Sequence, residues 1–113
     1  MSTANNGKIV IGIPLKNGAN TLRRAVESIL TQRSVEREIL ILIVNDGSTD
    51  NWRDVISDYL DDQRIIIENV KFGKTYAVRN FILDYIRKNI PDAEYIGRLD
   101  ADDFIVDEYA LSK

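Results

Sequence analysis

Three carboxylates within four residues, Asp100, Asp102 and Asp103, form the strongest chemical signal in this chain. They directly follow residues 94–99, a run with the length and composition of a β-strand. Two carboxylates about 4 Å apart repel by roughly 4 kcal/mol at an effective dielectric of 20, so open water or a bound cation must offset the repulsion. Mg²⁺ and Mn²⁺ prefer oxygen ligands and often share them with substrate phosphates. The stretch therefore predicts either a solvated acidic turn, with Asp103 as a helix cap, or a divalent-metal site.

The composition narrows the chemistry that such a site could support. The 113 residues suit one domain, and they include no cysteine and no histidine. Thiolate nucleophiles, disulfides, Ser-His-Asp triads and histidine metal sites are therefore excluded, and any metal ion must be held by oxygen ligands. A net charge of −3 without a basic block argues against a nucleic-acid partner.

The chain contains no apolar run approaching the roughly 20 residues of a membrane span, and residues 1–8 lack the apolar core of a signal peptide. We therefore expect a soluble, cytoplasmic protein without a transmembrane segment. Peripheral attachment at the inner face of the membrane stays open.

The elements that must position the carboxylates alternate between strands and helices. We expect strands at residues 8–13, 38–44, 64–68 and 94–99, with helices over residues 20–32, 52–60 and 75–89. Pro14 should end the first strand's ladder because it has no N–H. The expected helix caps are Asn20 or Thr21, Asp50, and Thr75. This order predicts an α/β fold: a mostly parallel sheet of about four strands, in the order 3-2-1-4, with helices on both faces.

In sheets of this kind ligands bind outside the carboxyl ends of the strands. Residues that could contact a ligand follow three of the expected strands: Pro14, Asn17, Asp46, Asp100 and Asp102. With strand order 3-2-1-4 they share one edge of the sheet. Asp46 lies in residues 45–50, which have the composition of a turn, and Arg79 lies in the first turns of the third helix, beside the same edge.

Two well-known nucleotide-binding motifs are incomplete in this chain. Gly73-Lys74-Thr75 resembles the end of a phosphate loop, but Glu68 occupies the position of the first required glycine. Gly73 more simply supplies a positive φ or a close backbone approach. The turn after the first strand lacks the G-x-G-x-x-G of a dinucleotide fold.

Five stretches taken together resemble the nucleotide-binding half of a family 2 glycosyltransferase with the GT-A fold. They are Ile11 to Asn17, Ser28 to Gln32, Val44 to Asp50, Gly73 with Ala77 to Asn80, and Leu99 to Asp103. The five occur in the same order and at roughly the same spacing as in that family.

The resemblance implies that this half binds a nucleoside diphosphate sugar, most often a UDP-sugar, with Mn²⁺ or Mg²⁺. The implied nucleotide-sugar-binding residues are Pro14, Asn17, Asp46, Arg79 and Asp100, and the implied metal ligands are Asp102 and Asp100. In this scheme the backbone near Pro14 and the carboxylate of Asp46 hold the base, and Arg79 lies near the base or diphosphate. Asp100 contacts the ribose side, directly or through the metal that Asp102 binds. The sugar passes with inversion to an acceptor hydroxyl.

The chain departs from the family pattern at two positions and in length. Lys16 stands where the family commonly has tyrosine, Asn45 stands where it commonly has aspartate, and the spacing from Gly73 to Arg79 is one residue longer than usual. Family members are about twice as long. We therefore expect residues 1–7 to be a flexible N-terminus and residues 8–113 to be the nucleotide-sugar-binding part of a GT-A domain.

The acceptor-binding part and the catalytic base are then expected beyond Lys113, so no catalytic residue is assigned in this chain. The expected partners are the nucleotide sugar and a saccharide or lipid-linked acceptor, with self-association where the missing part would dock. Two alternatives stay open. One is a non-catalytic GT-A-like binding module, although Asp46 and the Asp100-x-Asp102 step favour an enzyme. The other is a nucleotidyltransferase, which would require a phosphate loop richer in glycine and lysine after the first strand.

Overall fold

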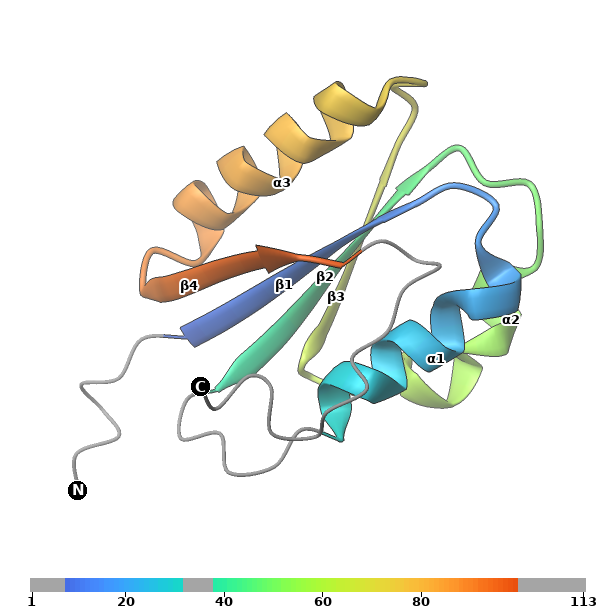
Figure 1. Ribbon diagram of the computed structural model, residues 1–113, viewed down its shortest axis with the longest axis horizontal. Helices are drawn as coiled ribbons and strands as arrows, with labels where there is room; N and C mark the ends of the chain where they lie inside the picture. Colours follow the sequence, from blue (N-terminus) through green and yellow to red (C-terminus); the bar gives the residue numbers. More distant parts are fainter. Residues whose placement is uncertain (1–7, 32–37, 100–113) are drawn as a thin grey trace.

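The computed structural model describes residues 8–31 and 38–99 (Figure 1). The predicted flexible N-terminus, residues 1–7, lies outside this part. The elements are β1 (Lys8–Leu15), α1 (Ala19–Leu30), β2 (Ile39–Asp46), α2 (Trp52–Val55), the 3-10 helix η2 (Ser57–Tyr59), β3 (Ile65–Val70), α3 (Thr75–Asn89) and β4 (Ala93–Arg98). The sheet order is β3-β2-β1-β4, which confirms the predicted topology. Figure 1 shows α3 on one side of the sheet and α1 with α2 on the other.

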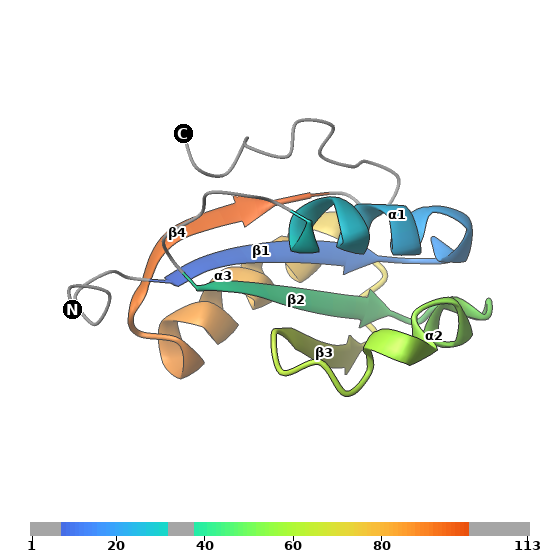
Figure 2. The ribbon, with the colours of Figure 1, turned by 90° about the horizontal axis from the view of Figure 1, so that it is seen from below.

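All strand pairs in the described sheet are parallel. Strand β1 pairs with β2 as far as Leu15↔Asn45, and β2 pairs with β3 as far as Asp46↔Val70. The strand arrows in Figure 2 therefore all point the same way, and the carboxyl ends gather at one edge. Each of the first three strands continues from this edge into a helix, so the β1–α1, β2–α2 and β3–α3 turns lie at the same edge.

Pro14 does not end the ladder of β1, contrary to the sequence prediction, because it pairs with Val44 inside the strand. The Ile9 N–H donates to Glu38 on the β2 side, while Leu99 donates to the Gly12 carbonyl on the β4 side. Along a strand, the backbone N–H and C=O groups of successive residues point toward opposite neighbouring strands. Pro14 is two residues after Gly12, so its nitrogen faces the β4 side. Within the described residues, pairing with β4 ends at Gly12↔Arg98, so no ladder bond there requires a proline N–H.

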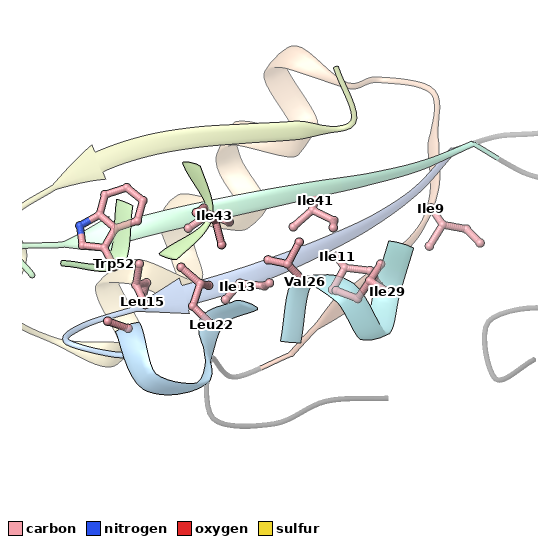
Figure 3. Close-up of a cluster of buried hydrophobic side chains, with 12 residues drawn as sticks. Ile9, Ile11, Ile13, Leu15, Leu22, Val26, Ile29, Ile41, Ile43 and Trp52 are labelled. Atoms are coloured by element: carbon pink, nitrogen blue, oxygen red, sulfur yellow. The ribbon is translucent and has the colours of Figure 1, made fainter. Parts of the chain in front are cut away.

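The central strands are apolar on both faces, which is typical of strands covered from both sides. One cluster packs Ile11, Ile13, Ile41 and Ile43 against the α1 side chains Leu22, Val26 and Ile29 (Figure 3). The alternate strand residues Val10, Leu42 and Val44 pack against Val78, Ile82 and Ile86 of α3. Gly12 allows this close approach, because a Cβ there would lie 2.8 Å from Ile82 Cγ2. These two layers bury the central strands between the helices and so position the strand ends.

The second helix is shorter than its apolar spacing predicted. It makes one turn, and Ile56, with φ −120°, separates it from η2. Arg23 of α1 donates to the Val55 carbonyl at 3.0 Å and to both oxygens of Asp58 at 2.7 Å. These contacts between elements hold the segment in two short pieces instead of one helix.

The predicted side-chain caps of these three helices, Asn20 or Thr21, Asp50 and Thr75, are also wrong, whereas Asp103 lies outside the described residues. Helices α1 and α3 begin after Gly18 and Lys74, and neither N-cap residue makes a side-chain capping bond. Asp50 does not cap α2, whose N-cap is Asn51. Asp50 instead accepts the Ala19 N–H of α1 at 2.9 Å. Its acceptor satisfies a helix start 31 residues earlier in the chain.

Candidate functional site

A cavity of about 610 Å³ opens at the carboxyl edge of the sheet. Its walls are the β1–α1 turn with the first turn of α1, and the β3–α3 turn with the first turns of α3. The lining residues are Pro14, Leu15, Lys16, Asn17, Gly18, Asn20, Thr21, Asp46, Gly73, Lys74, Thr75, Val78 and Arg79. This is where parallel sheets bind their ligands.

The cavity brings together four of the residues predicted from the sequence: Pro14, Asn17, Asp46 and Arg79. Asp100 and Asp102, the other two, lie outside the described residues. The last described residue is Leu99, whose N–H donates to the Gly12 carbonyl at 3.0 Å. The predicted sharing of one edge by Asp46 and Asp102 therefore stays a prediction.

Asp46 is a buried carboxylate at the end of β2, with 6% of its surface exposed. The composition of residues 45–50 predicts a turn at Asp46, but Asp46 pairs with Val70 as the last residue of the strand. Its Oδ1 accepts the N–H groups of Phe72 at 2.7 Å and Gly73 at 3.1 Å. Its Oδ2 accepts the Gly73 N–H at 3.0 Å. Asp46 thus shapes the β3–α3 turn as well as lining the cavity.

Gly73 has a positive φ, at +70°, which is the first of the two roles predicted for this glycine. No heavy atom of residues 8–31 or 38–99 lies within 4 Å of a Cβ built there, so the requirement for glycine comes from the backbone and not from crowding. The left-handed conformation turns the Gly73 N–H toward Asp46 and starts α3 two residues later. The turn and the carboxylate therefore define one wall of the cavity together.

Asn17 lies in the opposite wall and also has a positive φ, at +53°. Its Oδ1 accepts the Thr49 N–H at 2.8 Å and the Thr49 hydroxyl at 3.3 Å, while its own N–H donates to Ser48 Oγ at 2.9 Å. The Asn17 carboxamide oxygen is therefore occupied by the β2–α2 loop. The side-chain nitrogen of Asn17, Nδ2, makes no hydrogen bond within residues 8–31 and 38–99.

Three cationic side chains line the cavity: Lys16, Lys74 and Arg79. Lys74 lies 5.8 Å from the centroid of the Tyr76 ring. Arg79 is exposed and forms no ion pair with the described part of the chain. Sequence reasoning gave no ligand role to Lys16 and Lys74. The usable signal was the position of both lysines in turns after parallel strands; Lys74 was considered only as part of an incomplete phosphate loop, and Lys16 only as a departure from the family's tyrosine.

The described residues contain no group of three acidic side chains that could hold a metal ion. The predicted metal ligands are Asp100 and Asp102, which follow β4 in the sequence and lie outside the described residues. Because the chain has no histidine or cysteine, such a site would offer oxygen donors alone, which suits Mg²⁺ or Mn²⁺. Among the helices in the described ranges, none has both the length and the apolar character needed to cross a membrane.

Comparison with known proteins gives one family and one fold. The family model described as Glycosyl transferase family 2 matches residues 10–113. An uncharacterized glycosyltransferase of Mycoplasma genitalium, MG025, is 36% identical over 96 residues, which are 83% of this chain and 31% of that protein. The chondroitin synthase of Pasteurella multocida is 36% identical over 98 residues, covering 86% of this chain and 9% of the synthase. The chain thus spans about a third or less of the length of these relatives.

Among solved structures, S. aureus TarS residues 1–349 in complex with UDP matches with a TM-score of 0.73 at 20% identity. The match covers 93% of this chain and 30% of that one. The same protein in complex with UDP-GlcNAc matches with a TM-score of 0.71 at 20% identity, covering 86% of this chain and 27% of that one. These likenesses establish a shared α/β fold.

Proposed function

Because this chain belongs to glycosyl transferase family 2, we propose that its cavity binds a nucleoside diphosphate sugar, with a UDP-sugar as donor. The observation that carries the proposal is the pairing, in one cavity, of a buried carboxylate with three cations. The solved TarS complexes with UDP and UDP-GlcNAc support the choice of nucleotide.

Asp46 is the proposed contact for the base. A carboxylate has about four lone-pair sites, and Phe72 and Gly73 occupy two on Oδ1 and one on Oδ2. One site on Oδ2 stays available for an N–H group such as the imide of uracil. The hydrogen bonds that Asp46 accepts from the backbone fix its carboxylate before a ligand arrives. Less conformational entropy is then lost on binding.

Lys16, Lys74 and Arg79 are the proposed contacts for the diphosphate. Against the single negative charge of Asp46, they give the described cavity lining a formal charge of +2. Charge-assisted hydrogen bonds from lysine and arginine to phosphate are about twice as strong as neutral ones, and an arginine can bind two phosphate oxygens at once. This lining favours a ligand with an anionic group.

Asp102 and Asp100 are the proposed ligands of Mn²⁺ or Mg²⁺. The metal would offset the charge that develops on the leaving nucleotide. We further propose that the whole protein transfers the sugar, with inversion, to a hydroxyl of a saccharide or lipid-linked acceptor. The base that activates this hydroxyl is not among the residues assigned here.

Calorimetric titration of UDP tests these assignments in wild type, Asp46→Asn and Asp102→Asn, each with Mn²⁺ and with EDTA. We expect Asp102→Asn to weaken binding in Mn²⁺ and to leave the poorer EDTA affinity unchanged. Asp46→Asn should weaken binding in both conditions. Asp84→Asn, an exposed carboxylate on α3 outside the cavity, is the control. Equal wild-type affinities in Mn²⁺ and EDTA would remove the metal role, and no binding in either condition would reject the donor site.

A further inference from the structure

The β2–α2 loop, residues 47–50, lies against the β1–α1 turn that forms one wall of the cavity. Four hydrogen bonds between described residues join them, although the partners are 31 or 32 residues apart in the chain. They are Asn17 N–H to Ser48 Oγ, Thr49 N–H and Thr49 Oγ1 to Asn17 Oδ1, and Ala19 N–H to Asp50 Oδ2. We call residues 47–50 the bracket.

The bracket stabilises a turn that is unfavourable by itself. Asn17 has a φ of +53°, a conformation that side-chain-bearing residues rarely adopt, although asparagine tolerates it better than most. Gly18, the N-cap of α1, has no side chain with which to satisfy the first N–H groups of the helix. Ser48 and Asp50 supply acceptors on both sides of this point, at Asn17 and Ala19.

Asp50 is placed to act through charge as well as through its hydrogen bond. Its Oδ1 is buried and has no hydrogen-bond partner in the described ranges, while Oδ2 accepts from the start of α1. A negative charge at a helix N-terminus is favourable because the unpaired N–H groups there carry partial positive charge. This attraction explains how a partly unsatisfied carboxylate is kept at this position.

The bracket is itself attached to the sheet. The Ser48 N–H donates to Asn45 Oδ1 at 3.0 Å, and Asn45 Nδ2 donates to Asn69 Oδ1 at 3.0 Å. Asn45 is 8% exposed and is the penultimate residue of β2, while Asn69 belongs to β3. A continuous series of hydrogen bonds therefore runs from β3 through β2 and the bracket to the cavity wall.

We propose that Ser48 and Asp50 are positioning residues, which hold the β1–α1 turn in its ligand-binding conformation before the nucleotide arrives. Neither residue lines the cavity, whereas Lys16, Asn17 and Gly18 of the turn do. Ser48 and Asp50 therefore affect the ligand through the turn and not by contact. The effect on nucleotide affinity rests on the proposed function.

Paired substitutions test the positioning role. Ser48→Ala removes the acceptor for the Asn17 N–H, and we expect the dissociation constant for UDP with Mn²⁺ to rise roughly 3- to 10-fold. Ser48→Thr keeps the hydroxyl and should stay within about twofold of wild type. Asp50→Ala should weaken binding by a similar factor, and Asp50→Asn, which keeps an acceptor, should recover part of it.

Asp58→Ala is the matched control, since it breaks the ion pair between Arg23 and η2 away from the cavity. It should lower the unfolding temperature without changing UDP affinity. Amide hydrogen exchange without nucleotide gives a second readout. We expect protection of the Asn17 amide to be lost in Ser48→Ala, and that of the Ala19 amide in Asp50→Ala, with β2 protection retained.

Three results overturn the inference: wild-type affinity in both alanine variants, an equal loss of affinity in Asp58→Ala, or unprotected Asn17 and Ala19 amides in the wild type. Failure of the wild type to bind UDP would contradict the proposed function instead. In that case the exchange measurement alone decides whether Ser48 and Asp50 hold the turn.

Discussion

Asp46 at the end of β2 holds the backbone N–H of Gly73 with both carboxylate oxygens, at 3.1 Å from Oδ1 and 3.0 Å from Oδ2. The two residues are 27 positions apart, and Gly73 has a φ of +70°. This contact ties the end of a buried strand to the turn before α3. The shape of one cavity wall therefore depends on a carboxylate and a glycine together.

The first prediction concerns the structural part of the Asp46 role. Asp46→Asn replaces one acceptor oxygen by an N–H₂ group facing the Gly73 N–H, so the free energy of unfolding should fall by about 1–3 kcal/mol. Urea denaturation followed by circular dichroism measures this change. The exposed Asp84→Asn should unfold like the wild type. Unchanged stability of Asp46→Asn would show that the contact contributes little.

The second prediction concerns Gly73. An L-residue with a left-handed backbone costs about 1–2 kcal/mol, so Gly73→Ala should lower the free energy of unfolding by roughly that amount. Gly73→Asn should cost less, because asparagine tolerates this conformation. The order glycine, asparagine, alanine in urea denaturation supports the backbone explanation. Equal losses for the two variants would contradict it, since no atom in the described part of the chain lies within 4 Å of the added Cβ.

The third prediction concerns the cationic lining. Arg79→Gln should weaken UDP binding about tenfold, equivalent to ~1.4 kcal/mol, because it removes a charge from the proposed phosphate contact. The loss should shrink at high salt, which screens exposed charges. Lys88→Gln, in the last turn of α3 and outside the cavity, is the control. If both substitutions weaken binding equally, the effect comes from overall charge and not from the cavity.

The fourth prediction concerns acid unfolding. Hydrogen bonds from Arg23 hold the pKa of the Asp58 carboxyl below its ordinary value of 3.8. A carboxyl whose pKa is lowered by folding adds stability above its unfolded pKa, and this stability is lost as the pH falls through the folded value. The unfolding temperature should therefore decrease as the pH is lowered below about 4. The decrease should be smaller in Asp58→Asn and in Arg23→Gln. An unchanged acid profile in both variants would exclude this pair as a source of the pH dependence.

The sequence was sufficient for the sheet and its core. The apolar runs at residues 8–13 and 38–44 predicted two of the strands, and alternation with helices predicted the order β3-β2-β1-β4 that the structure has. These features depend on periodicity and on right-handed crossovers, which are properties of the chain alone.

Contacts between distant segments could not be read from the same pattern. Asn45 and Asp46 have turn-like composition, yet pairing with Asn69 and Val70 extends β2 through both. Local spacing likewise made Asp50 the cap of the following helix, whereas it accepts the Ala19 N–H of α1. Side-chain acceptors that serve another element become visible only when the elements are in place.

The proposed function requires that the cavity between the β1–α1 turn and α3 hold a nucleoside diphosphate. Its most direct test is the titration of UDP with Mg²⁺ into the ¹⁵N-labelled chain, with amide chemical shifts followed by NMR. We expect saturable shifts at Lys16, Asn17, Gly73, Thr75 and Arg79, with little change in α2 and η2. No saturable shifts, or shifts confined to residues away from this cavity, would contradict it.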